Sequence, residues 1–585
     1  DFKQAGYKSF LGVPYGFPKD PTKMVTGVAI GQNTYARSGS IMLGTHNYKG
    51  NLGDVTVDSA NTKAQNMSLF STTLGANSYS NGLFSSVTGA YSIASSNYDG
   101  GENATKNFGA TITGSLNSIE SATSSNEYSG VANSIVGVAN RTSNSNGSLI
   151  FGAGNEIQNS ITDISAPTSG GDSAKALQDS LMKKVQRGNS GGATLVIGAG
   201  NKADYTQKTQ ILGVNNKVTG TEKNISDYNM IDGFGNTIHG ASHLYTIGTN
   251  NKITNTKNTI LAGDDYTNVS GLTDSVIIGN NRVRGKDDKA EFAYFSNQNN
   301  IVSIGNKNVL DSTDGSISIG NNNFMWRSGG QPEKYGYDTG NVAIGNNTYI
   351  NSYLNQGDSI VIGKNATAMN MGGSLEKAFA FGTPEGKDYS GSIAIGQNSY
   401  ARSGSTMIGI HNYQGKLGDL DIDFTKGKSE GSSGIGNYQE SIDATTIGNN
   451  SYNNGVFSTV VGSYTAVSGL YHNQKWGEKP YGVQNFGAAV LGSLNSVEGL
   501  TSTEHNTAGM ADSILGSANR TKNANGTIMV GAGNVVEDSI NDFDATEIKT
   551  KDGIASPNAL SDAMRTSIKK PMVAAQQLLS VTAMK

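Results

Sequence analysis

The hydrophobic positions of this chain recur as a short unit. Two apolar residues flank a third residue, glycine follows, and then comes a polar, asparagine-rich run, as in VAIGQN, TQILGVNN, SISIGNNN and SIAIGQN. Side chains of a strand alternate between two faces, so each unit predicts a short strand whose two flanking residues share one face. We expect that face to line the core, with Ile393, Ile395, Met407 and Ile408 as core candidates.

The glycine of each unit sets the period of the repeat. Steps of 15 residues separate Gly198 from Gly213 and Gly305 from Gly320, and some steps are 13 or 14 residues. This period accommodates two short strands and two turns, and such strands gain stability only by stacking on the next unit. The prediction is an all-β chain, a parallel β-solenoid of 13–15 residues per coil, in which longer steps are coils with inserted loops. The structural glycines of the repeat include Gly31, Gly198, Gly213, Gly248, Gly305, Gly320, Gly345 and Gly396.

Glycine and asparagine suit the corners of such a coil. Glycine allows a positive φ or a close approach of two backbones, and asparagine pairs suit turns that enter the left-handed region. Stacked coils would place like residues above one another, so Asn and Ser side chains can form ladders. Each coil offers few large apolar residues, on more than one wall. Association of several chains would bury the second wall.

A larger module occurs twice. VAIGQNTYARSGSIMLGTHNY at 28–48 returns as IAIGQNSYARSGSTMIGIHNY at 393–413, and matching pieces follow both copies in the same order. A helix is predicted between the first copy and the central repeats, because Ala176, Leu177, Leu181 and Val185 recur at a spacing of three to four. We expect it to cover the end coil or to pack against a neighbouring chain. The predicted organisation is an N-terminal segment (1–26), the first module (27–172), the helical insert (173–191), central solenoid repeats (192–391), the second module (392–555) and a helical segment (556–585).

Composition narrows the class of protein. Glycine contributes 77 of 585 residues, the net charge is −4, and cysteine is absent. Without a block of Lys or Arg, the chain does not read as a binder of nucleic acid. The lack of cysteine excludes disulfides and thiolate metal sites. No apolar run reaches about 18 residues, so no membrane helix is expected.

Candidate catalytic chemistry is sparse. His239 and His243 in HGASH are four residues apart, but Gly, Ala and Ser between them suit a solenoid turn better than a metal-binding helix. The acidic pairs in GDDYTN (263–268) and GKDDKAE (285–291) favour solvated charge over a cation site. The GAGN turns lack the third glycine and the helix of a dinucleotide site. We therefore expect no catalytic, cofactor-binding or metal-binding residues, no cofactor and no enzyme activity. A hexapeptide-repeat acyltransferase is the enzymatic alternative, but its 18-residue coil differs from the period seen here.

The repeat also resembles a known family. SIAIGQNSYARSGS (392–405), VAIGQNTYARSGS and NVAIGNNTYINS are similar to the head repeats of trimeric autotransporter adhesins, the YadA-like head. The resemblance implies a left-handed parallel β-roll, assembly as a homotrimer, and a head held off the bacterial outer membrane by a stalk. It implies adhesion to host cell-surface or matrix proteins as a virulence function, and some members bind receptors of the CEACAM group.

The family's membrane anchor and long coiled-coil stalk have no counterpart in these residues. We therefore expect this chain to be the extracellular passenger, attached to the outer membrane through a part outside this sequence. MVAAQQL, within 556–585, is similar to the family's neck element, and an ordinary terminal helix is the alternative.

Partner binding is expected on loops outside the repeat, because Trp, Tyr and Arg dominate protein-binding surfaces. Three stretches, 289–298, 323–338 and 469–482, concentrate such residues. The alternative is that these side chains pack onto the solenoid or between chains. A structural, self-associating fibre that drives autoaggregation or biofilm is the alternative function. The candidate partner-binding residues are Phe292, Tyr294, Phe324, Trp326, Arg327, Tyr335, Tyr337, Tyr471, Trp476 and Tyr481.

Overall fold

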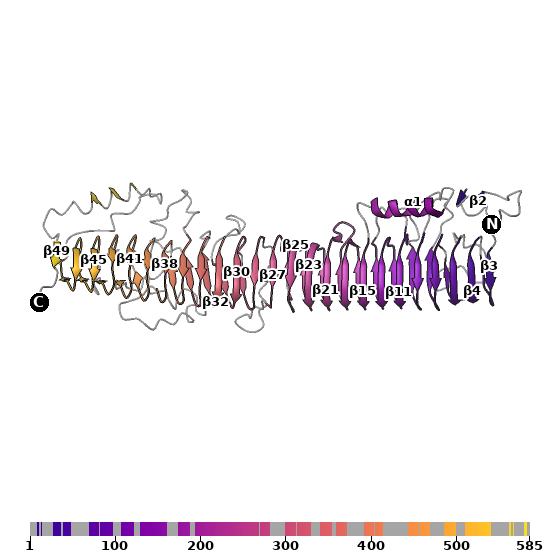
Figure 1. Ribbon diagram of the computed structural model, residues 1–585, viewed down its shortest axis with the longest axis horizontal. Helices are drawn as coiled ribbons and strands as arrows, with labels where there is room; N and C mark the ends of the chain where they lie inside the picture. Colours follow the sequence, from indigo (N-terminus) through magenta and orange to yellow (C-terminus); the bar gives the residue numbers. More distant parts are fainter. Residues whose placement is uncertain are drawn as a thin grey trace. The chain divides into compact units, whose positions relative to one another are not determined.

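The computed structural model divides the chain into two compact units, Asp1–Asp274 and Ser275–Lys585. Both are built from short parallel strands that stack coil upon coil (Figure 1). The structure describes residues 9–10, 13–14, 27–36, 39–47, 70–80, 82–96, 107–121, 129–160, 174–187, 193–267, 269–280, 299–311, 313–328, 340–353, 358–370, 391–402, 404–412, 443–453, 455–468, 485–498, 509–539, 558, 561–562, 565–566 and 578–581.

The first unit has two main walls of parallel strands, and most of its described coils contribute one strand to each. The wall that carries the repeat glycine is called the first wall, and the other the second wall. The first wall contains β3 (Val28–Ile30), β4 (Ile41–Thr45), β5 (Thr72–Ala76), β7 (Ser86–Thr88), β9 (Thr111–Thr113), β11 (Ser134–Val138), β13 (Leu149–Ala153), β15 (Leu195–Ala199), β18 (Gln210–Val214), β21 (Met230–Phe234), β23 (Ser242–Thr249) and β25 (Lys257–Ala262). The second wall contains β6 (Tyr79–Ser80), β8 (Ile93–Ser96), β10 (Ser118–Ser121), β12 (Arg141–Ser143), β14 (Glu156–Gln158), β16 (Lys202–Asp204), β19 (Lys217–Thr219), β22 (Thr237–His239), β24 (Lys252–Thr254) and β26 (Val269–Ser270).

Three smaller pieces complete the first unit. The short strands β17 (Thr206–Gln207) and β20 (Ser226–Asp227) pair in parallel, β1 (Ser9–Phe10) and β2 (Val13–Pro14) pair antiparallel, and the one helix described at length is α1 (Ala174–Arg187).

The second unit repeats this plan. Its first wall contains β27 (Val276–Ile278), β28 (Val302–Ile304), β30 (Ile317–Asn321), β32 (Val342–Asn346), β34 (Ile360–Ile362), β36 (Ile393–Ile395), β38 (Thr406–Ile408), β39 (Thr445–Ile447), β41 (Thr459–Val461), β43 (Ala489–Leu491), β45 (Ser513–Ser517), β47 (Ile528–Ala532) and β49 (Leu578–Val581). Its second wall is formed by two five-stranded sheets. One contains β29 (Val309–Asp311), β31 (Phe324–Ser328), β33 (Tyr349–Tyr353), β35 (Thr367–Asn370) and β37 (Tyr400–Arg402), and the other β40 (Tyr452–Asn453), β42 (Ala466–Ser468), β44 (Ser496–Glu498), β46 (Arg520–Lys522) and β48 (Val535–Glu537). The prediction of a parallel β-solenoid is confirmed.

The core is formed by the middle residue of most three-residue strands and by the second residue of most five-residue strands. Ala394 and Met407 are fully buried, whereas Ile393 and Ile395 are half-buried and Ile408 is 36% exposed. The prediction that the flanking isoleucines line the core is therefore wrong, and only Met407 was placed correctly. The narrow coil admits one inward side chain from a three-residue strand, so pleating sends both neighbours outward.

The repeat glycines stack directly on one another. In the first unit, from Gly31 to Gly248, they have φ between +117° and +148°. A Cβ added to any of them would lie 1.6–1.9 Å from the carbonyl oxygen of the glycine one coil on. Only glycine fits a backbone this close to its neighbour. All eight repeat glycines named from the sequence have a positive φ.

A ladder of buried asparagines runs beside the glycines. In the first unit, Nδ2 of each donates to the carbonyl oxygen of the glycine in the next coil at 2.6–2.9 Å. Each Oδ1 accepts the backbone N–H of the next coil's ladder position at 3.0–3.2 Å. Each side chain thus satisfies polar backbone groups that the coil buries. The ladder residues are Asn117, Asn140, Asn155, Asn201, Asn216, Asn236 and Asn251, and the predicted asparagine ladder is confirmed.

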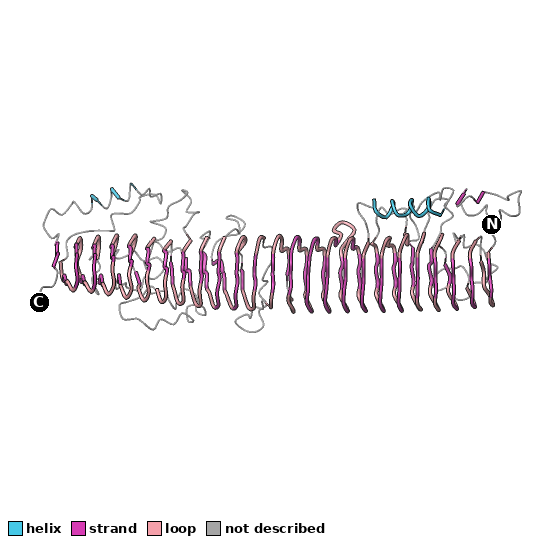
Figure 2. Tube along the Cα trace, viewed as in Figure 1, coloured by secondary structure: helices cyan, strands magenta, loops and turns pink. Residues whose placement is uncertain are grey.

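Helix α1 lies along the coils of its own chain (Figure 2). Leu177, 8% exposed, and Leu181 pack into a cluster with Leu83, Phe108 and Val131. Ala176 and Val185, the other members of the predicted apolar face, are exposed, so Leu177 and Leu181 are the members of that face that pack into the cluster. The helix therefore covers the side of coils in its own first module.

The C-terminal segment differs from its prediction. Within 556–585, predicted to be helical, the structure describes helical residues at 558, 561–562 and 565–566 and then strand β49. That strand pairs in parallel with β47, so the described end of the segment belongs to the first wall. Within its sequence, LLSV, the apolar residues Leu579 and Val581 alternate with Ser580, as expected of a short strand.

Candidate interaction surfaces

The outward face of the first wall carries a continuous apolar column in the second unit. The residue before each repeat glycine is Ile, Val or Leu in twelve coils that pair in register. Many of these side chains are well exposed, for example Ile447 at 42% and Leu515 at 53%. We call this column the apolar stripe. It comprises Ile278, Ile304, Ile319, Ile344, Ile362, Ile395, Ile408, Ile447, Val461, Leu491, Leu515 and Val530.

The first unit carries a related but interrupted stripe. Ile30, Leu43 and Leu74 pair in register, as do Val136, Phe151, Ile197 and Leu212. Thr88, Thr113 and Asp232 break the apolar column between and beyond these runs. Exposed apolar side chains also flank it, including Val28, Ile41 and Tyr245 at 40–44%. Monomeric soluble proteins rarely leave a contiguous apolar strip of this kind in water.

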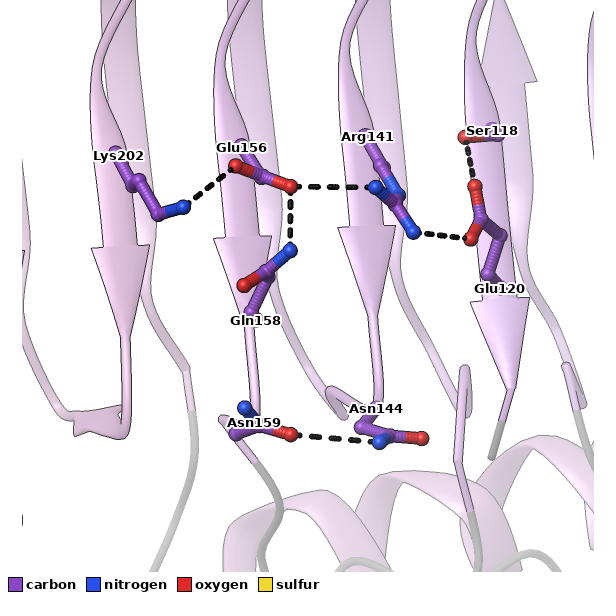
Figure 3. A network of polar contacts seen from close by, with 8 residues as sticks. All are labelled: Ser118, Glu120, Arg141, Asn144, Glu156, Gln158, Asn159 and Lys202. Atoms are coloured by element: carbon purple, nitrogen blue, oxygen red, sulfur yellow. Dashed lines mark hydrogen bonds and ion pairs between the residues drawn. The ribbon is translucent and has the colours of Figure 1, made fainter. Parts of the chain in front are cut away.

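The outward face of the second wall is polar and cross-linked by charge (Figure 3). In the first unit Arg141 contacts Glu120 at 2.7 Å and Glu156 at 3.4 Å, and Lys202 contacts Glu156 at 3.2 Å. Ser118 donates to Glu120 at 2.8 Å, and Gln158 donates to Glu156. These half-exposed pairs each contribute little to stability, but they neutralise one another across four successive coils.

The second module repeats this charged ladder. Arg520 binds Glu498 through two hydrogen bonds, at 2.9 and 2.8 Å, and lies 3.8 Å from Glu537. The hydrogen bonds that Arg520 donates to Glu498 raise the pKa of the guanidinium above its ordinary value. The charged side chains on the outward face of the second wall therefore find partners within the chain, whereas the apolar side chains of the first wall stay exposed.

Most of the predicted partner-binding residues lie outside the described residues. The exceptions are Phe324, Trp326 and Arg327, which the structure places in strand β31 of the second wall and not in a projecting loop. Phe324 is half-buried and stacks on Tyr349, with ring centroids 5.5 Å apart. The alternation in FMW, with Met325 buried, is a strand signal that the aromatic content obscured. The residues outside the described part are Phe292, Tyr294, Tyr335, Tyr337, Tyr471, Trp476 and Tyr481.

The histidine pair is divided between two places in the coil. His239 ends β22, where Nδ1 lies 3.0 Å from Thr219 Oγ1, and His243 stacks on Tyr228 with ring centroids 4.6 Å apart. Gly240, with φ +61°, turns the chain between them. The described residues contain no group of three or more His, Asp or Glu side chains placed to hold a metal ion.

The acidic pair of GDDYTN serves the backbone and its turns. Asp264 Oδ1 accepts the Thr249 N–H at 2.8 Å, and Asp265 Oδ1 accepts from Asn250 Nδ2 at 3.3 Å. The pair at 285–291 lies outside the described residues. Among the residues that the structure describes, no helix is both long and apolar enough to cross a membrane.

No model of a known protein family matches the chain, and no curated protein sequence matches it. What the chain does therefore has to be argued from its own surfaces. The residues of the apolar stripe are visible in the sequence as the apolar residue before the glycine of each I-x-I-G unit. The alternation alone led to the prediction that these residues line the core.

Proposed function

We propose that this chain is the head of a bacterial surface adhesin that works as a homotrimer. One observation carries the proposal: the in-register apolar stripe on the outward face of the first wall. Full burial of one Val, Leu or Ile side chain is worth about 1.5–3 kcal/mol, so a column repeated over many coils exceeds the entropic cost of association. The best occupant is a second and third copy of the same wall.

The sequence of the repeat units supports the same assignment. The units resemble the head repeats of trimeric autotransporter adhesins, and this resemblance implies a left-handed roll with three such walls placed together. The head then acts outside the cell, anchored to the outer membrane through another part of the protein. Its ligands are host cell-surface or matrix proteins, with CEACAM-type receptors among the candidates. The chain is a binding protein and not an enzyme.

A matched pair of substitutions tests the interface. Leu515, on the stripe, and Val535, on the second wall, are exposed to similar extents, 53% and 55%. In the trimer, Leu515→Glu buries three carboxylates in an apolar seam, so we expect dissociation into folded monomers at micromolar concentration. Val535→Glu changes charge equally but lies beside Arg520, and it should leave the trimer intact. Sedimentation velocity and circular dichroism report mass and folding; dissociation by both variants, or by neither, contradicts the assigned interface.

Receptor binding tests the function itself. Because β31 continues to Ser328 and the solenoid is again described at Gly340, the stretch 329–339 can be shortened without removing a described strand. We expect the purified chain to bind at least one protein in a panel of host receptors and matrix proteins, and the shortened variant to lose that binding while remaining trimeric. A chain that binds none of the panel but associates with itself into fibres would favour a structural, aggregating role instead.

A further inference from the structure

A buried carboxyl group interrupts the neutral interior of the second module. Asp512 precedes β45 and is fully buried. Its Oδ1 accepts the backbone N–H of Thr527 at 2.9 Å, whereas its Oδ2 has no hydrogen-bond partner. An ionised carboxylate in this position would keep one oxygen both desolvated and unpaired, which is strongly unfavourable.

The first module shows what the site requires. Its equivalent residue is Asn133, whose Oδ1 accepts the Ser148 N–H at 2.9 Å, just as Asp512 accepts that of Thr527. The Asn133 Nδ2 group donates to the Ser145 carbonyl oxygen at 2.9 Å and to the hydroxyls of Ser145 and Thr142 at 3.0 and 3.2 Å. The position of Asn133 Nδ2 therefore requires a hydrogen-bond donor. An aspartate can supply one only when it is protonated.

Among the described residues, no charged side chain near Asp512 offers an alternative to a proton. On the strands packed against this coil, the described charged side chains Glu498, Arg520, Lys522 and Glu537 occupy the outward positions that alternate with buried Val497, Thr521 and Val536. Arg520 is already bound to Glu498, and Asp538 accepts from Asn523 Nδ2 at 3.0 Å.

We infer that Asp512 is a proton-binding site that makes the second module sensitive to pH: the coil holds a neutral carboxyl group, and loss of its proton loosens the stack around it. The first module, with Asn133 in the same place, lacks this sensitivity. The inference depends on the duplicated geometry and not on the adhesin assignment, so each can fail without the other.

The direction of the effect follows from the titration. Burial raises the pKa of Asp512 from 3.8 to about 7. The backbone N–H that Thr527 donates lowers the pKa in part, as do the nearby hydroxyls of Thr521 and Thr527, although neither hydroxyl forms a hydrogen bond in the structure. The folded module thus binds the proton more tightly than the unfolded chain. The stabilisation is complete below about pH 4, declines as pH rises towards 7, and is absent above that value.

Hydrogen exchange on the full chain tests the inference. Peptides that cover Asp512 and Thr527 should lose protection between pH 5 and pH 7, after correction for intrinsic exchange, by up to about tenfold per pH unit. In Asp512→Asn the loss should disappear, and protection at pH 8 should rise on the order of 10²- to 10³-fold over the unsubstituted chain. Peptides around Asn133 should show no such slope in either protein. An equal slope in the unsubstituted chain and in Asp512→Asn would overturn the inference.

The reciprocal substitution and a direct probe complete the test. Asn133→Asp should transfer the same pH slope to the first module while the second module keeps its own. If that variant does not fold, infrared spectroscopy of the unsubstituted chain at pH 6 still decides. A protonated-carboxyl band that is absent in Asp512→Asn supports the inference, and identical spectra of the two proteins would overturn it.

Discussion

Replacing Gly152 by alanine should unfold the coils around it, whereas the same change at Gly154 should be tolerated. A Cβ at Gly152 would lie 1.8 Å from the Gly198 carbonyl oxygen, where φ is +140°. At Gly154, where φ is +65°, the nearest atom to an added Cβ is 3.9 Å away. The clash at Gly152 involves backbone on both sides and cannot be relieved by a rotamer change. We expect a loss of more than about 4 kcal/mol there and about 1–2 kcal/mol at Gly154.

Thermal unfolding and hydrogen exchange measure this difference. Gly152→Ala should remove protection from β11, β13 and β15, which meet at this stack, and Gly154→Ala should retain it. The same Gly→Ala change is made at two positions only two residues apart. The comparison therefore separates the effect of the close backbone approach from that of the conformational freedom of glycine. Equal losses at both positions would mean that conformational freedom, and not the stacked backbone, explains the repeat glycine.

Replacing Asn216 by alanine should be the second large loss, while its neighbour Asn215 should accept glycine with little effect. Asn216 is 1% exposed and donates to the Gly233 carbonyl oxygen at 2.8 Å and to Asn201 Oδ1 at 3.1 Å. Its own Oδ1 accepts from Asn236 N–H and Nδ2 at 3.2 and 2.9 Å. Alanine leaves several of these groups buried without partners, at about 1–3 kcal/mol each, so we expect a total loss of about 3–5 kcal/mol.

Asn215 provides the matched control. It is exposed and has φ +56°, a conformation that glycine adopts without strain, so Asn215→Gly should change stability by less than about 1 kcal/mol. Chemical denaturation of the two variants, followed by far-ultraviolet circular dichroism, gives the comparison. A larger loss of stability in Asn215→Gly than in Asn216→Ala would contradict the structural role assigned to Asn216.

The sequence was sufficient to predict the period of the repeat, the parallel stacking of its strands and the asparagine ladder. The glycine spacing predicted which strands stack, because a repeat too short to bury its own core can be stable only against its neighbours. It did not distinguish the inside of a strand from its outside. In Ile393–Ile395 the small middle residue, Ala394, faces inward, and alternation is equally compatible with either assignment. The width of the coil decides, and it becomes apparent only when the turns are in place.

The candidate surfaces were less predictable than the fold. Aromatic content placed Phe324 on a loop, although the buried Met325 beside it shows a strand. The proton-binding site had a signal in the sequence. When the two modules are aligned, Asp512 occupies the position of Asn133 within a segment that is otherwise similar. That difference acquires meaning only with the burial of both side chains and the unpaired Oδ2 of Asp512.

The mass of the chain in solution decides whether the head is a trimer. We assign the apolar stripe of the first wall to contacts between three copies, and one chain has a mass of 61.0 kDa. Sedimentation equilibrium at micromolar concentration should therefore give a single species of three times that mass. A stable species of 61.0 kDa under the same conditions would leave the stripe exposed to water and would contradict the trimeric head.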